Sequence, residues 1–301
     1  MTQGTNEQTA QPVIEIQGLS RRYRAKMALD DVSLNVPAGC VFGLLGESGA
    51  GKTTLIRHLI GLLKPQKGTA RVLGRDPVKD PEGTLGRIGY LSEDRDLPGW
   101  MRIDELMRYT QGIYPHWDET FADDLIERLD LDPSQKIKTL SRGQKAKTGL
   151  VTALAHRPEL LLLDEPSSGL DPVVRRHILS AVMRTVAEEG RTVLFSSHLL
   201  HEVESIADRV CVIHRGKVVL CDKLPNIIAR HRRFRVHFEQ PQSPDPVFEG
   251  AIGCEGHGRD WTVLCDGMAD QFRAQIVSSG AKIVEESKPS LEDIFVALIH
   301  I

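Results

Sequence analysis

The segment Gly46-Glu47-Ser48-Gly49-Ala50-Gly51-Lys52-Thr53 contains the residue types that most directly indicate chemistry. It fits the pattern GxxxxGK[ST], in which glycines let successive backbone N–H groups curl around phosphates. In that pattern the lysine reaches the outer phosphates and the final hydroxyl ligates magnesium. The segment, together with Thr54, is therefore predicted to bind a nucleoside triphosphate, with Lys52 on the phosphates and Thr53 on Mg²⁺.

Two acids, Asp164 and Glu165, follow the apolar run at 160–163. The C-terminal end of a buried parallel strand lies at the edge where open α/β sheets bind ligands. We predict that Asp164 holds magnesium and that Glu165 orients or polarises the water that attacks the γ-phosphate. An apolar run that ends in acids is a weak signal alone, because many strands end in a solvated Asp. The upstream phosphate loop is what favours the catalytic interpretation.

These residues need strands and helices that bring them together. The apolar run at 40–45 predicts a strand buried on both faces, and the apolar spacing over 54–63 predicts a helix. The phosphate loop lies between them, as its mechanism requires. Further strands are predicted at 160–163, 192–195, 210–213 and 218–221, with helices at 173–189 and 199–206. This alternation predicts an α/β fold with a largely parallel sheet.

The chain divides by pattern into three parts. Residues 1–12 are polar and are expected to be a disordered lead-in, and residues 13–224 carry the nucleotide motifs with a mostly helical insert at about 92–150. Residues 232–301 are predicted to form a small α+β domain. The basic run Arg230-His231-Arg232-Arg233 between the last two parts is interpreted as a solvated linker, with anionic lipid or nucleic acid as the alternative contact.

Composition narrows the class of protein. The 301 residues are 41% hydrophobic and 26% charged with a net charge of −3, which is ordinary for a globular protein and argues against non-specific nucleic-acid binding. No apolar run approaches the roughly 18 residues that span a bilayer, so another chain is expected to supply any membrane span. The five cysteines form no CxxC pair, which predicts free thiols in a reducing compartment rather than a zinc site.

Further motifs resemble those of ABC ATPases over about residues 13–222. Leu140-Ser141-Arg142-Gly143-Gln144 resembles the signature LSGGQ, with Arg142 in place of its first glycine, and residues 167–171 resemble the D-loop. The resemblance places Ser141, Gly143, Gln144 and Asp171 in the nucleotide-binding set. It also implies that Tyr23 stacks on adenine and that His198 is the catalytic switch histidine. Glu93 stands where the family usually has a glutamine that touches magnesium, so Glu93 is a predicted metal ligand.

The resemblance also implies an activity and partners. The signature of one ABC ATPase completes the site of another, so two chains are expected to pair head to tail with ATP between them. Hydrolysis would then power transport through a separate membrane-spanning permease, at the cytoplasmic face of the cell membrane. Residues 93–114 are the expected surface for that partner.

The end of the chain refines this resemblance. The closing helix, which begins Ser-Leu-Glu-Asp-Ile-Phe at residue 290, is similar to that of type-two ABC exporters. Export is therefore the expected direction of transport. The alternative is a non-transport ABC ATPase that acts on nucleic acid or ribosomes. Such proteins usually carry fused cassettes, coiled coils or zinc modules, which this sequence lacks.

Overall fold

The computed structural model describes residues 11–187 and 190–299, so the expected lead-in lies almost wholly outside the described residues. Its centre is a six-stranded sheet with the order β5-β6-β7-β3-β8-β9. The strands are β3 (Val41–Leu45), β5 (Ile88–Leu91), β6 (Leu160–Leu163), β7 (Thr192–Ser197), β8 (Arg209–His214) and β9 (Lys217–Lys223). All neighbours are parallel except β8 and β9, which form an antiparallel hairpin. The predicted α/β class is confirmed.

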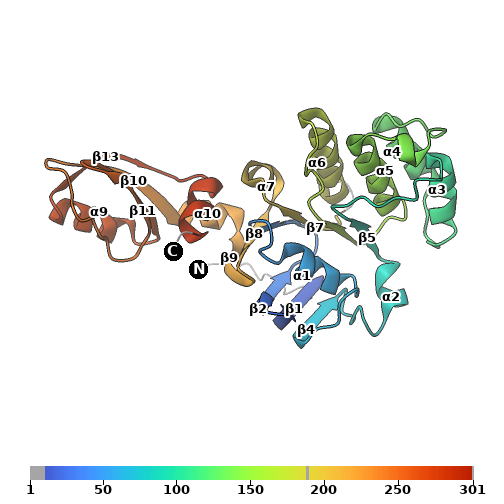
Figure 1. Ribbon diagram of the computed structural model, residues 1–301, viewed down its shortest axis with the longest axis horizontal. Helices are drawn as coiled ribbons and strands as arrows, with labels where there is room; N and C mark the ends of the chain where they lie inside the picture. Colours follow the sequence, from blue (N-terminus) through green and yellow to red (C-terminus); the bar gives the residue numbers. More distant parts are fainter. Residues whose placement is uncertain (1–10, 188–189, 300–301) are drawn as a thin grey trace, which may run out of the picture.

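A second, antiparallel sheet lies against the first, with α1 between them (Figure 1). It consists of β1 (Ile14–Tyr23), β2 (Lys26–Val36) and β4 (Lys67–Val72), in the order β2-β1-β4. Helix α1 (Lys52–Leu59) buries Leu55, Ile56 and Leu59 in the apolar cluster that the two sheets share. The helix ends at Leu59, four residues before the predicted end, because the glycine at 61 adopts a left-handed conformation.

The other face of the six-stranded sheet carries helices. These include α6 (Pro172–Ala187) and α7 (Leu200–Ile206), and beyond them α3 (Ile103–Gln111), α4 (Glu119–Arg128) and α5 (Arg142–Leu154), while the short α2 (Pro81–Leu85) precedes β5. Figure 1 shows α3, α4 and α5 together at one end of the molecule. Their apolar faces join those of β6 and β7 in one cluster, which includes Leu106, Leu125 and Leu150. The amphipathic pattern of the insert is thus explained by packing of helices against one another and the sheet.

The C-terminal part has its own four-stranded sheet, in the order β11-β12-β10-β13. Its elements are α8 (Leu224–Arg230), β10 (His231–Phe238), β11 (Ala251–His257), β12 (Asp260–Asp266), α9 (Ala269–Ser278), β13 (Ala281–Ser287) and α10 (Leu291–Ile299). Helix α9 buries Phe272 and Ile276 against one face of this sheet. Helix α10 packs on the other side and also contacts α7, so Leu291 and Ile294 belong to the same apolar cluster as Val203.

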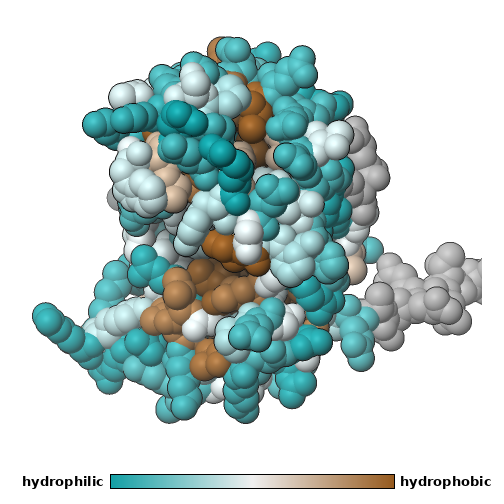
Figure 2. All heavy atoms as spheres, turned by 90° about the vertical axis from the view of Figure 1, so that its right-hand side faces the viewer, coloured by the Kyte–Doolittle hydropathy of each residue, from teal (hydrophilic) through white to brown (hydrophobic). Residues whose placement is uncertain are grey.

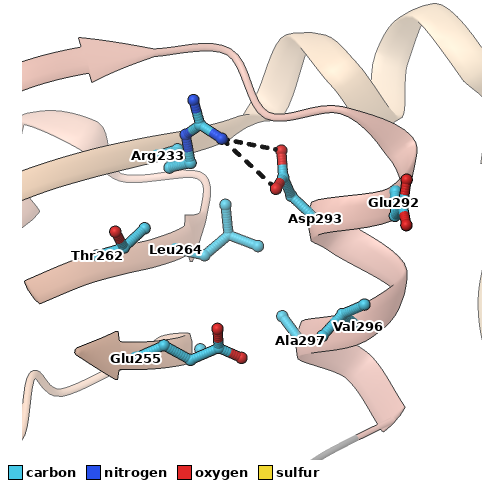
Figure 3. A pocket seen from close by; sticks show the side chains of 9 residues that line it. Arg233, Glu255, Thr262, Leu264, Glu292, Asp293, Val296 and Ala297 are labelled. Carbon is cyan, nitrogen blue, oxygen red and sulfur yellow. Dashed lines mark hydrogen bonds and ion pairs between the residues drawn. The ribbon is translucent and has the colours of Figure 1, made fainter.

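The interpretation of residues 230–233 as a solvated linker is wrong. They end α8 and begin β10, where His231 is 1% exposed. The guanidinium groups bind acids of neighbouring elements: Arg230 Nε lies 2.8 Å from Asp266 Oδ1, and Arg233 Nη1 lies 3.3 Å from Asp293 Oδ2 (Figure 3). The strand that contains Phe234 and Val236 begins at His231, three residues earlier than expected. Ion pairs with acidic side chains compensate the positive charges near its start.

Candidate functional site

The phosphate loop lies where the sequence predicts, between β3 and the first turn of α1. Its backbone geometry explains two of its glycines. A Cβ at Gly51, where φ is 119°, would lie 2.5 Å from the Ala28 carbonyl oxygen, and one at Gly46 would lie 2.4 Å from that of Ile213. Both positions therefore exclude any side chain, because the loop is pressed between β2 and the end of β8.

Lys52, Glu165 and His198 form one continuous set of contacts at the carboxyl ends of the parallel strands. Lys52 Nζ lies 3.0 Å from Glu165 Oε1, and His198 Nδ1 lies 2.7 Å from Glu165 Oε2. Lys52 also donates to the carbonyl oxygens of Gly46 at 2.6 Å and Glu47 at 3.2 Å. Lys52 is 6% and Glu165 5% exposed, so the carboxylate is held from both sides in a nearly dry environment.

The backbone of Glu165 is strained in a way that fixes this carboxylate. Its φ is 48°, in the left-handed region that non-glycine residues rarely adopt. The Glu165 N–H donates to Ser196 Oγ at 2.9 Å, and the same hydroxyl donates to Asp164 Oδ1 at 2.7 Å. Ser196 on β7 therefore ties both acids at the end of β6 in place, as expected where strain is held by the surrounding structure.

Asp164 is buried behind the cavity, with 1% exposure. Burial raises the pKa of this carboxyl, hydrogen bonds from Ser196 and Thr53 oppose the rise, and the charge of Glu165 adds to it. A hydroxyl beside a carboxylate with incomplete charge compensation is a donor pair that suits a hard divalent cation such as Mg²⁺. No cluster of three His, Cys, Asp or Glu residues suited to a metal occurs in residues 11–187 and 190–299. The donors therefore fit an ion that takes its remaining ligands from phosphate and water.

These residues surround a cavity of about 460 Å³. Its walls are Tyr23, Lys26, Ala28, Ser48, Gly49, Gly51, Lys52, Thr53, Thr54, Glu93, Glu165, Ser168 and His198. Three of them, Lys26, Ala28 and Ser168, were not in the predicted site. Lys26 and Ala28 enter because the β1–β2 hairpin folds over the phosphate loop, and no local motif marks that contact. Tyr23 is 39% exposed at the mouth, with the Arg21 guanidinium 4.9 Å from its ring centroid.

Several predicted residues do not line this cavity. Ser141, Gly143 and Gln144 lie at the start of α5, where the Ser141 hydroxyl accepts from the Gln144 N–H at 3.1 Å and Gln144 Oε1 accepts from the Ser141 N–H. Asp171 Oδ1 accepts from the N–H groups of Val173 and Val174 and so caps α6. Gly46, Glu47 and Ala50 belong to the phosphate loop, yet they are not among the lining residues.

Glu93 lines both the cavity of about 460 Å³, named the nucleotide cavity from here on, and a neighbouring hollow of about 330 Å³. That hollow is lined by Glu93, Asp94, Arg95, Arg142 and Lys145. Arg95 is 4% exposed and donates to the carbonyl oxygens of Pro166 at 3.1 Å and Ser168 at 2.9 Å. Sequence reasoning missed this arginine, which links the segment after β5 to the segment after Glu165.

The phosphate loop, the acid pair at the end of β6 and the histidine after β7 together define a P-loop ATPase of the ABC class. Residues 29–168 match the family model described as ABC transporter. The chain is 30% identical to the bacitracin transport ATP-binding protein BcrA of Bacillus licheniformis, over 95% of this chain and 97% of that protein. It is 31% identical to the Nod factor export ATP-binding protein I of Rhizobium johnstonii, over 95% and 94% of the two chains.

A solved structure described as the ATP-binding subunit of an ABC transporter superposes with a TM-score of 0.67. It is 30% identical and covers 72% of this chain and 92% of that one. The chain therefore belongs to the ABC transporter ATP-binding proteins, and it is an ATP-hydrolysing subunit. No helix in the described part of the chain combines the length and apolar character needed to cross a bilayer.

Proposed function

We propose that this subunit hydrolyses Mg-ATP between two head-to-tail copies of itself and thereby powers export through a separate permease at the inner face of the cell membrane. The observation that carries the proposal is the bridged carboxylate of Glu165, held 3.0 Å from Lys52 and 2.7 Å from His198. The contacts support roles for Glu165 as the base, for Lys52 as the phosphate-binding cation and for His198 as the ring that accepts or donates a proton.

In the proposed reaction the triphosphate lies along the phosphate loop, with adenine against Tyr23. Lys52 leaves Glu165 for the outer phosphates, whose negative charge competes with the carboxylate for the ammonium group. Glu165, still oriented by Ser196 and His198, then accepts a hydrogen bond from the attacking water and takes its proton. His198 holds the carboxylate on the side facing the γ-phosphate.

Thr53, Asp164 and Glu93 would hold Mg²⁺. The ion would neutralise charge that develops on the phosphate oxygens during transfer. Asp164 suits this role because its burial makes its own negative charge costly, and a nearby dication would offset that cost. Glu93, which also lines the cavity, would supply a further oxygen ligand.

The need for a second copy follows from where the signature lies. Ser141, Gly143, Gln144 and Asp171 do not line the cavity of their own chain. The Ser141 hydroxyl and the N–H groups at the start of the 13-residue helix α5 form an anion-binding end. A head-to-tail pair would place that end against the γ-phosphate bound by the partner copy.

The permease surface is proposed on the face formed by residues 93–114. Trp100 is 73%, Tyr109 58% and Ile113 56% exposed there. Figure 2 views the molecule from the end where α3 lies and shows apolar side chains exposed among hydrophilic ones, mostly in the lower half of that end. Exposed apolar patches of this kind mark interaction sites. Export is the proposed direction because a relative that covers nearly the whole chain is an export ATP-binding protein.

The test is the assembly state of Glu165→Gln, which keeps the shape of the side chain but removes the base. We expect this variant to bind Mg-ATP, to hydrolyse it very slowly and to double in mass by light scattering when ATP is added. The matched control is Glu165→Gln with Ser141→Arg, which leaves the phosphate loop intact. It should bind ATP and remain a monomer. A Glu165→Gln chain that stays monomeric when saturated with ATP would refute the head-to-tail site.

A further inference from the structure

Cys211 and Cys221 lie opposite each other at the edge of the six-stranded sheet. The antiparallel register of β8 and β9 pairs these two residues directly. Opposed residues in such a ladder have Cα atoms about 4.5 or 5.5 Å apart, and both separations fall within the range of roughly 4.4–6.8 Å that a disulfide spans. Opposed side chains also project from the same face of the sheet. The two sulfurs can therefore bond while the strands stay paired.

The two thiols differ in access and in acidity. Cys221 is exposed on the edge strand, whereas Cys211 is fully buried. A hydrogen bond from Cys211 lowers the pKa of Cys221, with desolvation opposing it and the Arg209 guanidinium assisting. The same hydrogen bond, and then burial, raise the pKa of Cys211. Cys221 is thus the nucleophile of the pair and Cys211 the proton donor, since the thiolate is the reactive form.

The other three cysteines lack this arrangement. Burial raises the pKa of Cys40 to about 11 and also raises the pKa values of Cys254 and Cys265. None of the three is opposite another cysteine in the strand registers of the described chain. Reactivity toward an oxidant is therefore expected at the β8–β9 hairpin alone.

We propose that Cys211 and Cys221 are a redox modification site that reacts with small hydroperoxides and closes to a reversible disulfide. The sulfur of Cys221 attacks the terminal oxygen of the hydroperoxide, the O–O bond breaks, and the leaving oxygen departs as an alcohol or water after taking a proton. The product is the sulfenic acid of Cys221. Cys211 then attacks that sulfur, an S–S bond forms, and the S–O bond breaks as water leaves with the Cys211 proton. Two electrons pass from the two thiols to the peroxide.

The site adjoins the phosphate loop without entering it. The turn between β8 and β9 holds that loop through the Gly216 N–H, which donates to the Ala50 carbonyl at 2.9 Å, while the Gly216 carbonyl accepts from Asp30 N–H at 2.8 Å. A disulfide between already paired strands leaves these bonds in place. Oxidation should therefore preserve ATP binding while it protects Cys221 from the irreversible sulfinic stage. Transient disulfides of this kind are the form that suits a reducing compartment.

The experiment treats the full chain with one equivalent of hydrogen peroxide and follows intact mass and peptide maps. We expect loss of two hydrogen atoms, a Cys211–Cys221 crosslinked peptide and recovery of both thiols with dithiothreitol. The melting temperature of the oxidised chain should rise by roughly 5 °C. Cys211→Ala should instead accumulate a sulfenic acid at Cys221 that dimedone traps, and Cys221→Ser should stay unmodified at that dose. Cys254→Ser is the control and should behave like the unaltered chain.

A second measurement is independent of crosslinking. The rate at which iodoacetamide alkylates Cys221 should fall in Cys211→Ala, because the thiol that stabilises the Cys221 thiolate is lost. Equal alkylation rates in the two chains would overturn the proposal. So would sulfinic acid at Cys221 without crosslink, or peroxide uptake by Cys221→Ser at the rate of the unaltered chain.

Discussion

Two of the hollows in the molecule differ in how their charges are held. The nucleotide cavity of about 460 Å³ has Lys52 and Glu165 almost fully buried, supplied by segments far apart in the chain. The hollow of about 310 Å³ in the C-terminal part lies between α10 and its sheet, and Leu264 and Ala297 are among the residues that line it (Figure 3). Its acids Glu255 and Glu292 are exposed, and its one ion pair, Arg233–Asp293, is about one-third exposed.

The difference shows that only the nucleotide cavity, of these two, holds buried charges. Buried charges are costly unless each finds a partner, so the nucleotide cavity keeps Lys52, Glu165 and Asp164 only because neighbouring strands bring those partners. Half-exposed charges need no such support and contribute little. We therefore expect matched substitutions in the two hollows to have very different effects.

The largest contrast is between two glutamates. Glu165→Gln should lower the ATPase rate by about 10³-fold, because general-base catalysis contributes roughly 10²–10⁴-fold. Glu255→Gln, the same change in the C-terminal hollow, should leave the rate within about two-fold of the unaltered chain, because interactions of exposed charges are weak. Steady-state turnover at saturating Mg-ATP measures both. Comparable losses in the two variants would show that the hollows are catalytically coupled.

Lys52→Ala should reduce ATPase activity by about 10²-fold or more, since removing one preorganised group that binds developing charge typically costs that much. It also leaves Glu165 buried without its cation. The control is Lys79→Ala, because the Lys79 side chain is 84% exposed beside Asp76 and does not line the cavity. Nucleotide binding by fluorescence and turnover should fall only in the first variant. Near-normal turnover in Lys52→Ala would overturn the assignment of the phosphate loop.

Replacing Asp164 or Asp293 by asparagine should change the free energy of unfolding at pH 7 in opposite directions. The folded-state pKa of Asp164 is raised by burial, so its ionised form destabilises the fold at pH 7, and this effect disappears below the ordinary aspartate pKa of about 3.9. Asp164→Asn should therefore raise the free energy of unfolding at pH 7 and not at pH 3.5. Asp293→Asn should lower it by about 1 kcal/mol, because Asp293 accepts from Ser290 N–H and pairs with Arg233. Urea unfolding titrations at pH 7 and pH 3.5 measure the free energy of unfolding of both variants.

The smallest effect concerns Glu93, which borders the nucleotide cavity from an exposed position. A carboxylate offers magnesium a full charge where glutamine offers a neutral carbonyl oxygen. In Glu93→Gln the half-saturating magnesium concentration for ATPase activity should rise by about two- to three-fold, within the modest range of a partly exposed charge. Binding of ATP without metal should improve. If neither quantity changes, Glu93 serves the adjoining arginine hollow rather than the metal.

Local patterns were enough to predict the phosphate loop, the acids after β6 and the alternation of strands and helices. They could not predict which side chains meet, because that depends on sheet order. Glu165 meets Lys52 and His198 only since β6, β7 and β3 are neighbours in register. Lys26 and Arg95 were missed for the same reason, and the basic residues of β10 were misjudged because their acidic partners are distant in sequence. The roles of the site residues remain predictions.

Helix α10 has one face on the C-terminal sheet and another on α7, which begins two residues after His198. Helix α10 therefore connects the C-terminal sheet to the helix that directly follows His198. Removing the C-terminal part would take Leu291 and Ile294 away from Val203 and so loosen the apolar packing of α7.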